Sequence, residues 1–266
     1  MGIQQRHQHL LRLISEHGHA SVDQLVRWLS VSPSTVRRDI SELVDSRLLV
    51  RKRNGASGPR DHAGMFSFPR QDIRASVQVY AERKRAIARH AAAMCADGES
   101  VIINGGSTTL MMTEFLAERR LQVITNSFQI ADRLLRTSDN EVIIRGGSVN
   151  RTHDLILSPF DSDVPQHDYD KIFIGVYGLS SMGAVEADLL LIRAVTPLMQ
   201  QAKQLIVLAD SSKFSNRTGH LLCALGRIDC VITDTYASSV HIEMLERAGI
   251  RVVTVPPDCV AAHAAG

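Results

Sequence analysis

The stretch VSPSTVRRDISELVDSRLLVRKRNGA, residues 31–56, decides the fold of the N-terminal part of the chain. Ser32 is a favourable N-cap and Pro33 suits the first helical position, so a helix is predicted from Pro33 onward. After it, the apolar residues 48–50, the basic residues 51–53 and the turn at 54–55 predict two short strands joined by a basic wing.

The predicted helix has two different faces. Val36, Ile40 and Leu43 fall at i, i+4 and i+7, so they are expected to face the core of a small domain. The opposite face is polar and carries two arginines, which can bind guanine edges or phosphates. The predicted DNA-binding residues on the helix and the wing are Ser34, Thr35, Arg37, Arg38, Ser41, Arg51, Lys52 and Arg53. The alternative is a merely solvated face, with Arg38 paired to Glu42 one turn later.

The preceding segment completes a helix-turn-helix pattern. A helix is expected from about Gln4 to Glu16, and Ser21 with Gln24 forms a capping box for a second helix that runs to Ser30. Residues 1–60 carry ten Arg and Lys against five Asp and Glu, whereas residues 61–266 carry twenty against twenty-three. The basic charge therefore lies at the end that holds the predicted winged helix-turn-helix, as expected if that end binds double-stranded DNA.

The composition of the whole chain is that of a globular protein: of 266 residues, 44% are hydrophobic and 22% charged. No stretch approaches the roughly 18 to 20 apolar residues that span a bilayer, and residues 1–10 lack the apolar run of a signal peptide. We therefore expect a cytoplasmic protein with no membrane partner. The cysteines at 95, 223, 230 and 259 form neither a C-x-x-C pair nor a Cys/His cluster, so no disulfide framework and no metal site are indicated.

Seven short β-rich runs alternate with helical stretches in the rest of the chain. They are VIIN at 101–104, LQVIT at 121–125, EVIIR at 141–145, KIFIGV at 171–176, QLIVLA at 204–209, CVIT at 230–233 and RVVTV at 251–255. Such apolar strands separated by helices predict a larger, doubly wound α/β domain whose parallel sheet is covered on both faces. The predicted organisation is a winged helix-turn-helix at 1–57, a linker at 58–76, the α/β domain at 77–256, beginning with a helix from about 77 to 95, and a tail at 257–266.

The first of these runs leads directly into a Gly-Gly-Ser-Thr-Thr loop at 105–109 and then into a helical segment. Glycines let the backbone approach a ligand, hydroxyls donate hydrogen bonds, and a helix start presents free N–H groups, so this loop can hold a phosphate or carboxylate. The loop has neither the G-x-x-x-x-G-K-[ST] nor the G-x-G-x-x-G pattern, so no nucleotide and no cofactor is implied. A plain turn is the alternative.

Polar residues and glycines also follow the other predicted strands. Ligands in open α/β sheets bind beyond the carboxyl ends of the strands, so these residues are expected around the same site. Lys213 can neutralise an anion, whereas Glu186 and Asp188 can bind ligand hydroxyls or merely cap the next helix. The predicted effector-binding residues are Asn104, Gly105, Gly106, Ser107, Thr108, Thr109, Thr125, Asn126, Gly146, Gly147, Tyr177, Glu186, Asp188 and Lys213.

Residues 31–56 resemble the winged helix-turn-helix signature of the DeoR family of transcription regulators, in which a Ser-x-x-Thr-x-Arg-Arg-Asp helix precedes an Arg-bearing strand and a Gly-Ala turn. Asn54 stands where the family usually has glycine, and the turn should tolerate it because Asn accepts positive φ. The resemblance extends over residues 82–255, where it implies an effector domain similar in fold to ribose-5-phosphate isomerase and glucosamine-6-phosphate deaminase.

The chain departs from the family pattern at two carboxylates. The family's phosphate loop usually begins with Asp where this chain has Asn104, and the family's Gly-x-Asp-Gly motif has Tyr177 in place of Asp, so the polyol part of the ligand should differ. The patterns at 104–108, 124–126, 158–159, 188–190 and 209–214 are similar to one branch of the family, the repressors of L-ascorbate utilisation. This similarity implies L-ascorbate 6-phosphate as the effector.

The resemblance implies repression of a carbohydrate catabolic operon, relieved by a phosphorylated sugar or sugar acid. A homodimer or homotetramer is expected, because one winged helix buries too little surface to bind an operator tightly. One alternative is a sugar-phosphate isomerase-like enzyme with an added DNA-binding domain, in which Glu186 or Asp188 is the base and Lys213 stabilises charge. The missing carboxylates argue against it. The other alternative is a DNA-binding scaffold whose cavity binds no ligand.

Overall fold

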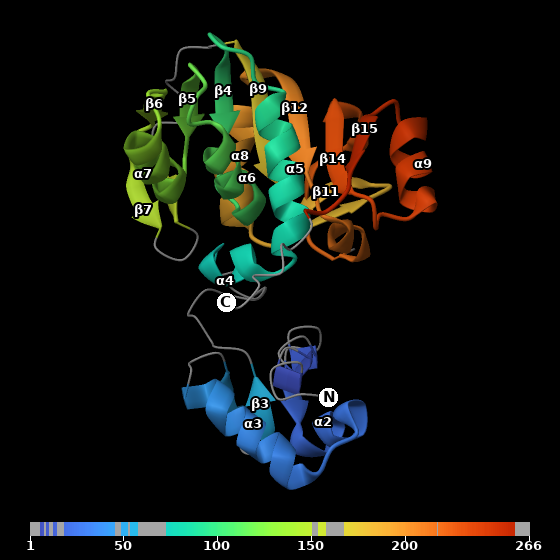
Figure 1. The fold of residues 1–266 in the computed structure, drawn as a ribbon. Helices are drawn as coiled ribbons and strands as arrows, with labels where there is room; N and C mark the ends of the chain where they lie inside the picture. The colour runs from blue at the N-terminus through green and yellow to red at the C-terminus, as the bar shows by residue number, and fades with distance from the viewer. Residues whose placement is uncertain are drawn as a thin grey trace, which may run out of the picture. The chain divides into compact units, whose positions relative to one another are not determined.

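The structure is a computed structural model that describes residues 6–7, 9–10, 13–14, 19–45, 49–52, 54–57, 73–150, 154–157, 168–216 and 218–258. Arg53, the 158–159 segment and Cys259 lie outside these residues. The chain divides into two compact units, Met1–Pro69 and Arg70–Gly266 (Figure 1), and the division falls within the predicted linker.

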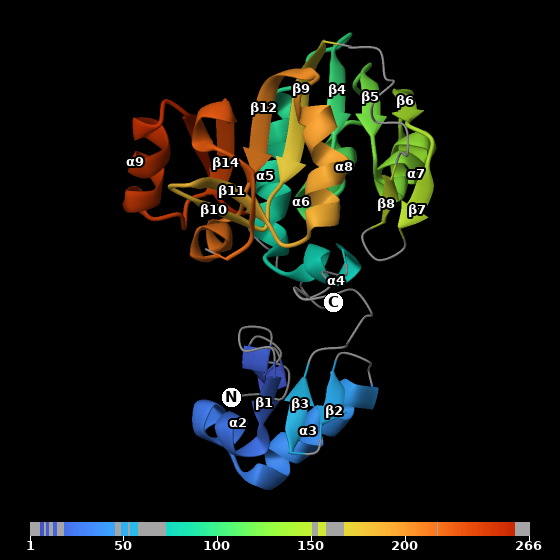
Figure 2. The ribbon, with the colours of Figure 1, turned by 180° about the vertical axis from the view of Figure 1, so that it is seen from behind.

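The first unit is a winged helix-turn-helix. Its two central helices are α2 (Val22–Leu29) and α3 (Pro33–Asp45), and the described residues of the predicted first helix, at 6–14, are helical. The strands β1 (His19–Ser21), β2 (Val50–Lys52) and β3 (Gly55–Ser57) form an antiparallel sheet in the order β1-β3-β2 (Figure 2). The sequence predicts both strands of the wing but not β1.

Local hydrogen bonds define where the two helices begin. Ser21 Oγ accepts from the Gln24 backbone N–H at 3.2 Å, and Gln24 Oε1 accepts from the Ser21 N–H at 2.9 Å. Ser32 Oγ accepts from the Thr35 N–H at 3.2 Å before the first turn of α3. The predicted capping box and the predicted N-cap are both confirmed.

The core of the first unit fixes the wing against the helices. It includes the predicted apolar stripe of α3, Val36, Ile40 and Leu43. Gly55 lies so close to β1 that a Cβ there would be 2.0 Å from the Ala20 carbonyl oxygen, so the backbone approach requires glycine.

Seven parallel strands form the sheet of the second unit, and each overlaps one predicted run. They are β4 (Ser100–Ile103), β5 (Gln122–Thr125), β6 (Glu141–Ile144), β9 (Tyr169–Gly175), β12 (Ala202–Leu208), β14 (Cys230–Asp234) and β15 (Arg251–Val255). Their order is β15-β14-β12-β9-β4-β5-β6. The chain builds outward from β4 in one direction and from β9 in the other, so the boundary between these two strands is the switch point of a doubly wound sheet. The predicted fold class is confirmed.

Helices cover both faces of this sheet (Figures 1 and 2). On one face lie α5 (Ala81–Ala93), α6 (Ser107–Met112) and α7 (Phe128–Thr137), and on the other lies α8 (Leu189–Met199). Successive residues of β4 alternate between the two cores, since Val101 and Ile103 pack with α5 and Ile102 packs with α8. The core on the α8 face also takes in Leu245 of α9 (Ser239–Arg247).

The helix predicted from about 77 to 95 is in fact two helices. The first, α4 (Ile73–Gln78), begins inside the predicted linker, and α5 follows after a turn. Tyr80 in that turn has a φ of 55°, a left-handed conformation that a right-handed helix cannot continue through. The apolar pattern from Val77 onward carries no sign of this break, so the sequence prediction of one helix is wrong.

Two small antiparallel additions to the main sheet were not predicted. A three-stranded sheet is formed by β10 (Gly178–Ser180), β11 (Gly183–Glu186) and β13 (His220–Cys223), and β7 (Ser148–Asn150) pairs with β8 (Leu155–Leu157). Short 3-10 helices occupy Thr113–Phe115, Ser211–Ser215 and Leu225–Arg227.

The described cysteines, Cys95, Cys223 and Cys230, are free. Burial raises the pKa of the Cys95 thiol to about 12 and also raises the pKa of the other two thiols. All three are therefore protonated at neutral pH. No helix in the described part of the chain is long and apolar enough to cross a bilayer.

Candidate functional site

The outward face of α3 presents Arg37 and Arg38 to solvent. Both arginines are exposed, and within the described part of the chain neither forms an ion pair. The Arg38–Glu42 pair considered from the sequence is thus not formed, and Glu42 instead lies 3.5 Å from His7 Nε2. Because the opposite face of the helix is core, the two guanidinium groups point away from the domain.

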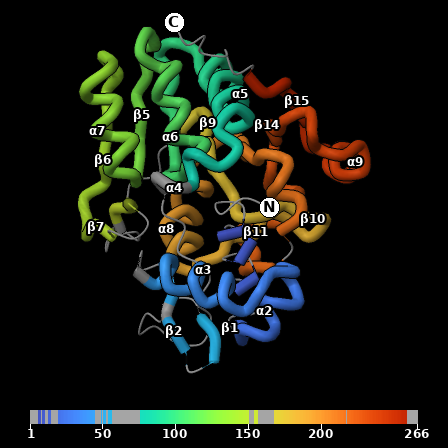
Figure 3. Tube along the Cα trace, turned by 60° about the horizontal axis from the view of Figure 1, so that its bottom comes forward, coloured from blue at the N-terminus to red at the C-terminus, as the bar shows by residue number. Residues whose placement is uncertain are grey.

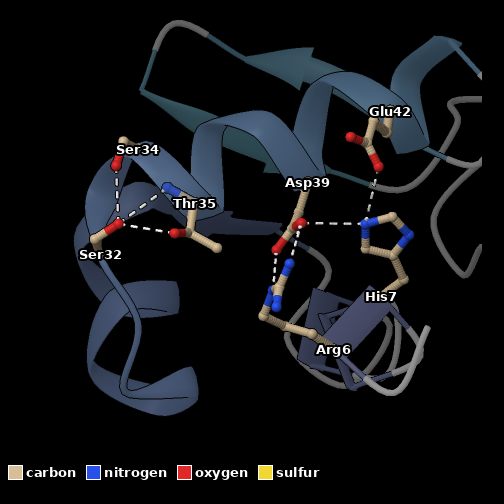
Figure 4. Close-up of polar contacts among 7 residues, drawn as sticks. All are labelled: Arg6, His7, Ser32, Ser34, Thr35, Asp39 and Glu42. Carbon is tan, nitrogen blue, oxygen red and sulfur yellow. Dashed lines mark hydrogen bonds and ion pairs between the residues drawn. The ribbon is translucent and has the colours of Figure 1, made fainter. Parts of the chain in front are cut away.

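The first turn of α3 gathers three hydroxyl groups (Figure 4). Ser32 Oγ lies 2.8 Å from both Ser34 Oγ and Thr35 Oγ1, so the three side chains share hydrogen bonds at the helix start. Ser34 is exposed and Thr35 half-buried. This polar cluster lies where the backbone N–H groups of the helix point outward, a favourable place for a DNA phosphate.

The wing strand β2 contacts the same face of α3. Ser41 Oγ donates to the Arg37 carbonyl at 3.0 Å and accepts a short hydrogen bond from Arg51 Nη2. Arg51 is therefore held against α3, while Lys52 is exposed. Of the predicted DNA-binding residues, only Arg53 lies outside the described residues.

Sequence reasoning missed the buried carboxylate on the inner side of α3. Asp39 is 1% exposed and accepts from Arg6 Nε at 2.5 Å, from Arg6 Nη2 at 2.9 Å and from His7 Nε2 at 3.1 Å (Figure 4). Burial alone would raise the Asp39 pKa, but the hydrogen bonds and charge of Arg6 and His7 outweigh it and lower that pKa. The ion pair joins the N-terminal segment to α3.

His7, Asp39 and Glu42 also lie close enough together to hold a metal ion. Both Asp39 oxygens, however, already accept hydrogen bonds from the Arg6 guanidinium, and a cation would have to displace that charge. The cluster is accounted for as an ion pair that orients α3.

In the second unit, a cavity lies beyond the carboxyl ends of β4 and β9, at the switch point of the sheet. Eight of the predicted effector-binding residues line it: Asn104, Gly105, Gly106, Ser107, Thr108, Tyr177, Glu186 and Lys213. Strand ends at a switch point diverge and leave a crevice, which is why residues from loops far apart in the sequence meet there.

A pair of asparagines holds the loop after β4 in place. Asn126 Oδ1 accepts from the Gly105 N–H at 3.0 Å, and Asn126 Nδ2 donates to Asn104 Oδ1 at 2.7 Å. A Cβ at Gly105 would lie 2.4 Å from Leu155 Cδ2, so the loop passes close to β8 and a larger residue would require the Leu155 side chain to shift. The next N–H groups, from Ser107 on, open α6 and lack intrahelical acceptors.

The cavity also contains one cationic and one acidic group. Among the described residues, the Lys213 ammonium has no hydrogen-bond or ion-pair partner. Burial raises the pKa of Glu186 to about 7, against the opposing effects of a hydrogen bond from the Ala187 N–H and the Lys213 charge. Glu186 is thus protonated in about half of the molecules near neutral pH, and can donate or accept a hydrogen bond.

The remaining predicted effector residues do not line the cavity. Thr109 Oγ1 donates to the Gly106 carbonyl, Thr125 Oγ1 donates to the Ile103 carbonyl at 2.7 Å, and Asp188 Oδ1 caps α8 by accepting from the Leu190 N–H at 2.8 Å. Asn126 acts on the loop as described. Gly146 and Gly147 are exposed after the edge strand β6.

Two residues at the cavity escaped sequence reasoning. Ser76 of α4 is part of its lining, and its Oγ donates to Ser107 Oγ at 3.2 Å. Lys84 of α5 is 2% exposed and donates to the Ser76 carbonyl at 2.6 Å. Ser76 lay in the predicted linker, and a lysine in a helix reads as a surface residue, so neither carried a sequence signal.

A winged helix with a free basic face, followed by an α/β domain with a polar cavity, is the architecture of a transcription regulator that senses a small molecule. The family model of the DeoR-like helix-turn-helix domain matches residues 6–60, and that of the DeoR C terminal sensor domain matches residues 80–235. The chain belongs to the DeoR family of DNA-binding regulators, as its sequence predicted.

A curated relative is the HTH-type transcriptional regulator UlaR of Shigella dysenteriae serotype 1 (strain Sd197), 33% identical over 251 residues, 94% of this chain and 98% of the relative. Among solved structures, a probable sor operon regulator from Shigella flexneri is 13% identical, with a TM-score of 0.39 over 62% of this chain and 88% of that one. Ribose 5-phosphate isomerase A from Methanocaldococcus jannaschii is 18% identical, with a TM-score of 0.36 over 49% of this chain and 53% of that one. The family and the full-length relative are regulators, so the chain is a regulator and not an enzyme.

Proposed function

We propose that this chain is a repressor that binds operator DNA through α3 and the wing. Arg37 and Arg38 enter the major groove, with the Ser34–Thr35 cluster beside a phosphate. Ser41 orients Arg51, which contacts the DNA backbone together with Lys52 and Arg53. The observation that supports this proposal is that both helix arginines are exposed and have no ion pair among the described residues, while the opposite face of the helix is buried.

We further propose that the cavity binds a phosphorylated sugar or sugar acid. The loop 105–108 offers backbone N–H groups and two hydroxyls to the phosphate, and Lys213 offsets its charge. Glu186 and Tyr177 line the same cavity and serve the polyol hydroxyls. The branch resemblance in the sequence makes L-ascorbate 6-phosphate the first candidate.

Repression and its relief require two arrangements of the protein that bind the effector differently. A homodimer or homotetramer in the cytoplasm binds repeated half-sites, and the effector favours the arrangement that releases them. About 1 to 3 kcal/mol of coupling between the sites is enough.

The experiment that tests the cavity is a thermal-shift measurement against phosphorylated sugars and sugar acids, each beside its unphosphorylated parent. A ligand at about 100 times its Kd stabilises by roughly 2.7 kcal/mol. We expect one phosphorylated compound, with L-ascorbate 6-phosphate tested first, to stabilise the protein while its parent does not.

Lys213→Ala is expected to remove most of that stabilisation. The matched control is Lys203→Ala, because Lys203 is an exposed lysine of β12 that pairs with Asp170 at 2.9 Å. Equal stabilisation of both variants would place the ligand elsewhere, and no stabilisation of the unaltered protein by any compound would favour a scaffold with an inert cavity.

A further inference from the structure

Helix α4 contributes Ser76 to the lining of the cavity and is the first described element after the segment that leads from the winged helix. We propose that α4 senses whether the cavity is occupied: Ser76 binds the anion together with Ser107, and Lys84 holds α4 in the position that allows this. The inference rests on the proposed anion site and adds to it the element that responds to the anion. It assigns Ser76 a binding role and Lys84 a positioning role.

Among the side chains of α4 that the structure describes, the polar contacts converge on Ser76. Ser76 Oγ donates to Ser107 Oγ at 3.2 Å, and the Lys84 ammonium lies 2.6 Å from the Ser76 carbonyl oxygen and 3.5 Å from its hydroxyl. Val77 packs against the core on the α5 face. A six-residue helix has little stability of its own, so contacts such as these help to hold α4 in place.

Charge explains why an anion would strengthen these contacts. Lys84 is 2% exposed, and burial, with the nearby Lys213 charge, lowers its pKa to about 8, while Asp210 opposes the shift. Lys84 is therefore mostly charged at neutral pH, and an anion bound at Lys213 cancels much of the repulsion between the two ammonium groups. A charged donor makes the stronger hydrogen bond, so the Ser76 carbonyl is held more tightly when the cavity is occupied.

The other end of α4 is anchored independently of the cavity. The Arg83 guanidinium stacks between the rings of Tyr80 and Tyr236, 4.4 Å from each, and donates to Ser211 Oγ at 2.9 Å. These contacts fix the turn between α4 and α5. Movement of α4 therefore pivots at Tyr80 and is transmitted toward the N-terminal side, the direction of the winged helix along the chain.

Hydrogen–deuterium exchange of the full chain tests the proposal, with inorganic phosphate as the anion and sodium chloride of equal ionic strength as the reference. The reporter amides are those of Val77 and Gln78 within α4, and that of Val79, which donates to the Ser76 carbonyl at 3.2 Å. We expect phosphate to slow exchange in peptides covering 73–80 by about 5- to 150-fold, the usual range of coupling between sites.

Variants separate the roles of the two residues. In Lys84→Met we expect phosphate to slow exchange of the 104–109 loop but not of 73–80, and in Lys84→Arg, which retains a charged donor, the effect on 73–80 should return. Lys203→Met is the control for loss of one lysine. Ser76→Ala leaves the carbonyl bound to Lys84 and should reduce the phosphate effect on 73–80, which covers the case in which Lys84→Met fails to fold.

Each outcome bears on a different claim. If phosphate slows exchange of the loop but not of 73–80 in the unaltered protein, α4 is no sensor, while the anion site stands. If it slows neither, both the anion site and this inference are overturned. If 73–80 responds equally in Lys84→Met and in the unaltered chain, Lys84 does not position α4.

Discussion

Substitution of the buried carboxylate of α3 should selectively unfold the winged helix. Asp39→Ala leaves the Arg6 guanidinium, whose side chain is 13% exposed, without its partner. Loss of the hydrogen bonds between these charged groups costs about 1 to 3 kcal/mol, because solvent still reaches the Arg6 side chain. A unit of 69 residues has a free energy of unfolding of about 3 to 10 kcal/mol, so this loss removes a large part of it. Asp39→Asn keeps one oxygen acceptor and the shape of the side chain, so we expect about half of the loss in unfolding free energy that Asp39→Ala causes.

The chain offers a selective assay, because its only tryptophan, Trp28, lies in α2 of the winged helix. Denaturant unfolding followed by tryptophan fluorescence therefore reports on this unit, while far-ultraviolet circular dichroism reports mainly on the larger one. Glu42→Gln is the control, because the Glu42 side chain is 51% exposed and its contact with His7 should contribute less than about 1 kcal/mol. The reasoning is refuted if Asp39→Ala shifts the tryptophan transition no more than Glu42→Gln does.

Three further predictions concern the DNA surface, the cavity and the fold. Arg37→Ala and Arg38→Ala should each weaken operator binding by about 1 to 3 kcal/mol, measured by fluorescence anisotropy. The unfolding transition followed by Trp28 fluorescence should not change; if stability falls as much as binding does, these arginines are structural. Because the Glu186 pKa of about 7 rises further beside an anion, binding should take up a proton and weaken from pH 6 to pH 8, about tenfold for each unit of pKa rise. In calorimetry, Glu186→Gln should no longer take up this proton on binding, so that the remaining pH dependence of the affinity comes from titration of the ligand alone. An unchanged pH profile in this variant would exclude Glu186 from the site. Gly178→Ala puts a Cβ 2.1 Å from the Asn216 carbonyl oxygen, so it should lower the stability of the larger unit by about 1 to 3 kcal/mol in thermal melts. Gly226→Ala is the control, because a Cβ there would lie in open space. Equal melting temperatures of the two variants would contradict the packing around β10.

The main elements were predictable because their signals are local. Apolar runs such as 171–176 specify buried strands, and Ser21 with Gln24 specifies a helix start, whatever the rest of the chain does. The strands β1 and β13 have only three and four residues, and each pairs with a strand distant in sequence, β3 and β11 respectively. The break at Tyr80 is likewise imposed by packing, since its cation–π contact with Arg83 is shared with Tyr236, 156 positions away in the numbering.

The residues of the candidate site that follow strand ends were predictable from the sequence, and those that lie on helices were not. The rule that ligands bind at the carboxyl ends of parallel strands identifies the loop after β4 and Tyr177 after β9. The same rule also included Gly146 and Gly147, which follow an edge strand far along the sheet order from the switch point. Ser76 reaches the cavity from α4, and Lys84 of α5 binds Ser76 from behind the lining; both roles depend on how these helices pack, which no short motif encodes.

Among the described residues, the hydrophobic core of the winged helix and the two cores of the larger unit have no residue in common. Each unit therefore folds around its own hydrophobic core, and a gene fusion that exchanged one unit would leave the core of the other intact. Recombination can in this way couple an existing DNA specificity to a new metabolite, or the reverse, in a single event. On the proposed role of α4, such an exchange must keep α4 together with the cavity, because Ser76 of α4 belongs to the cavity lining.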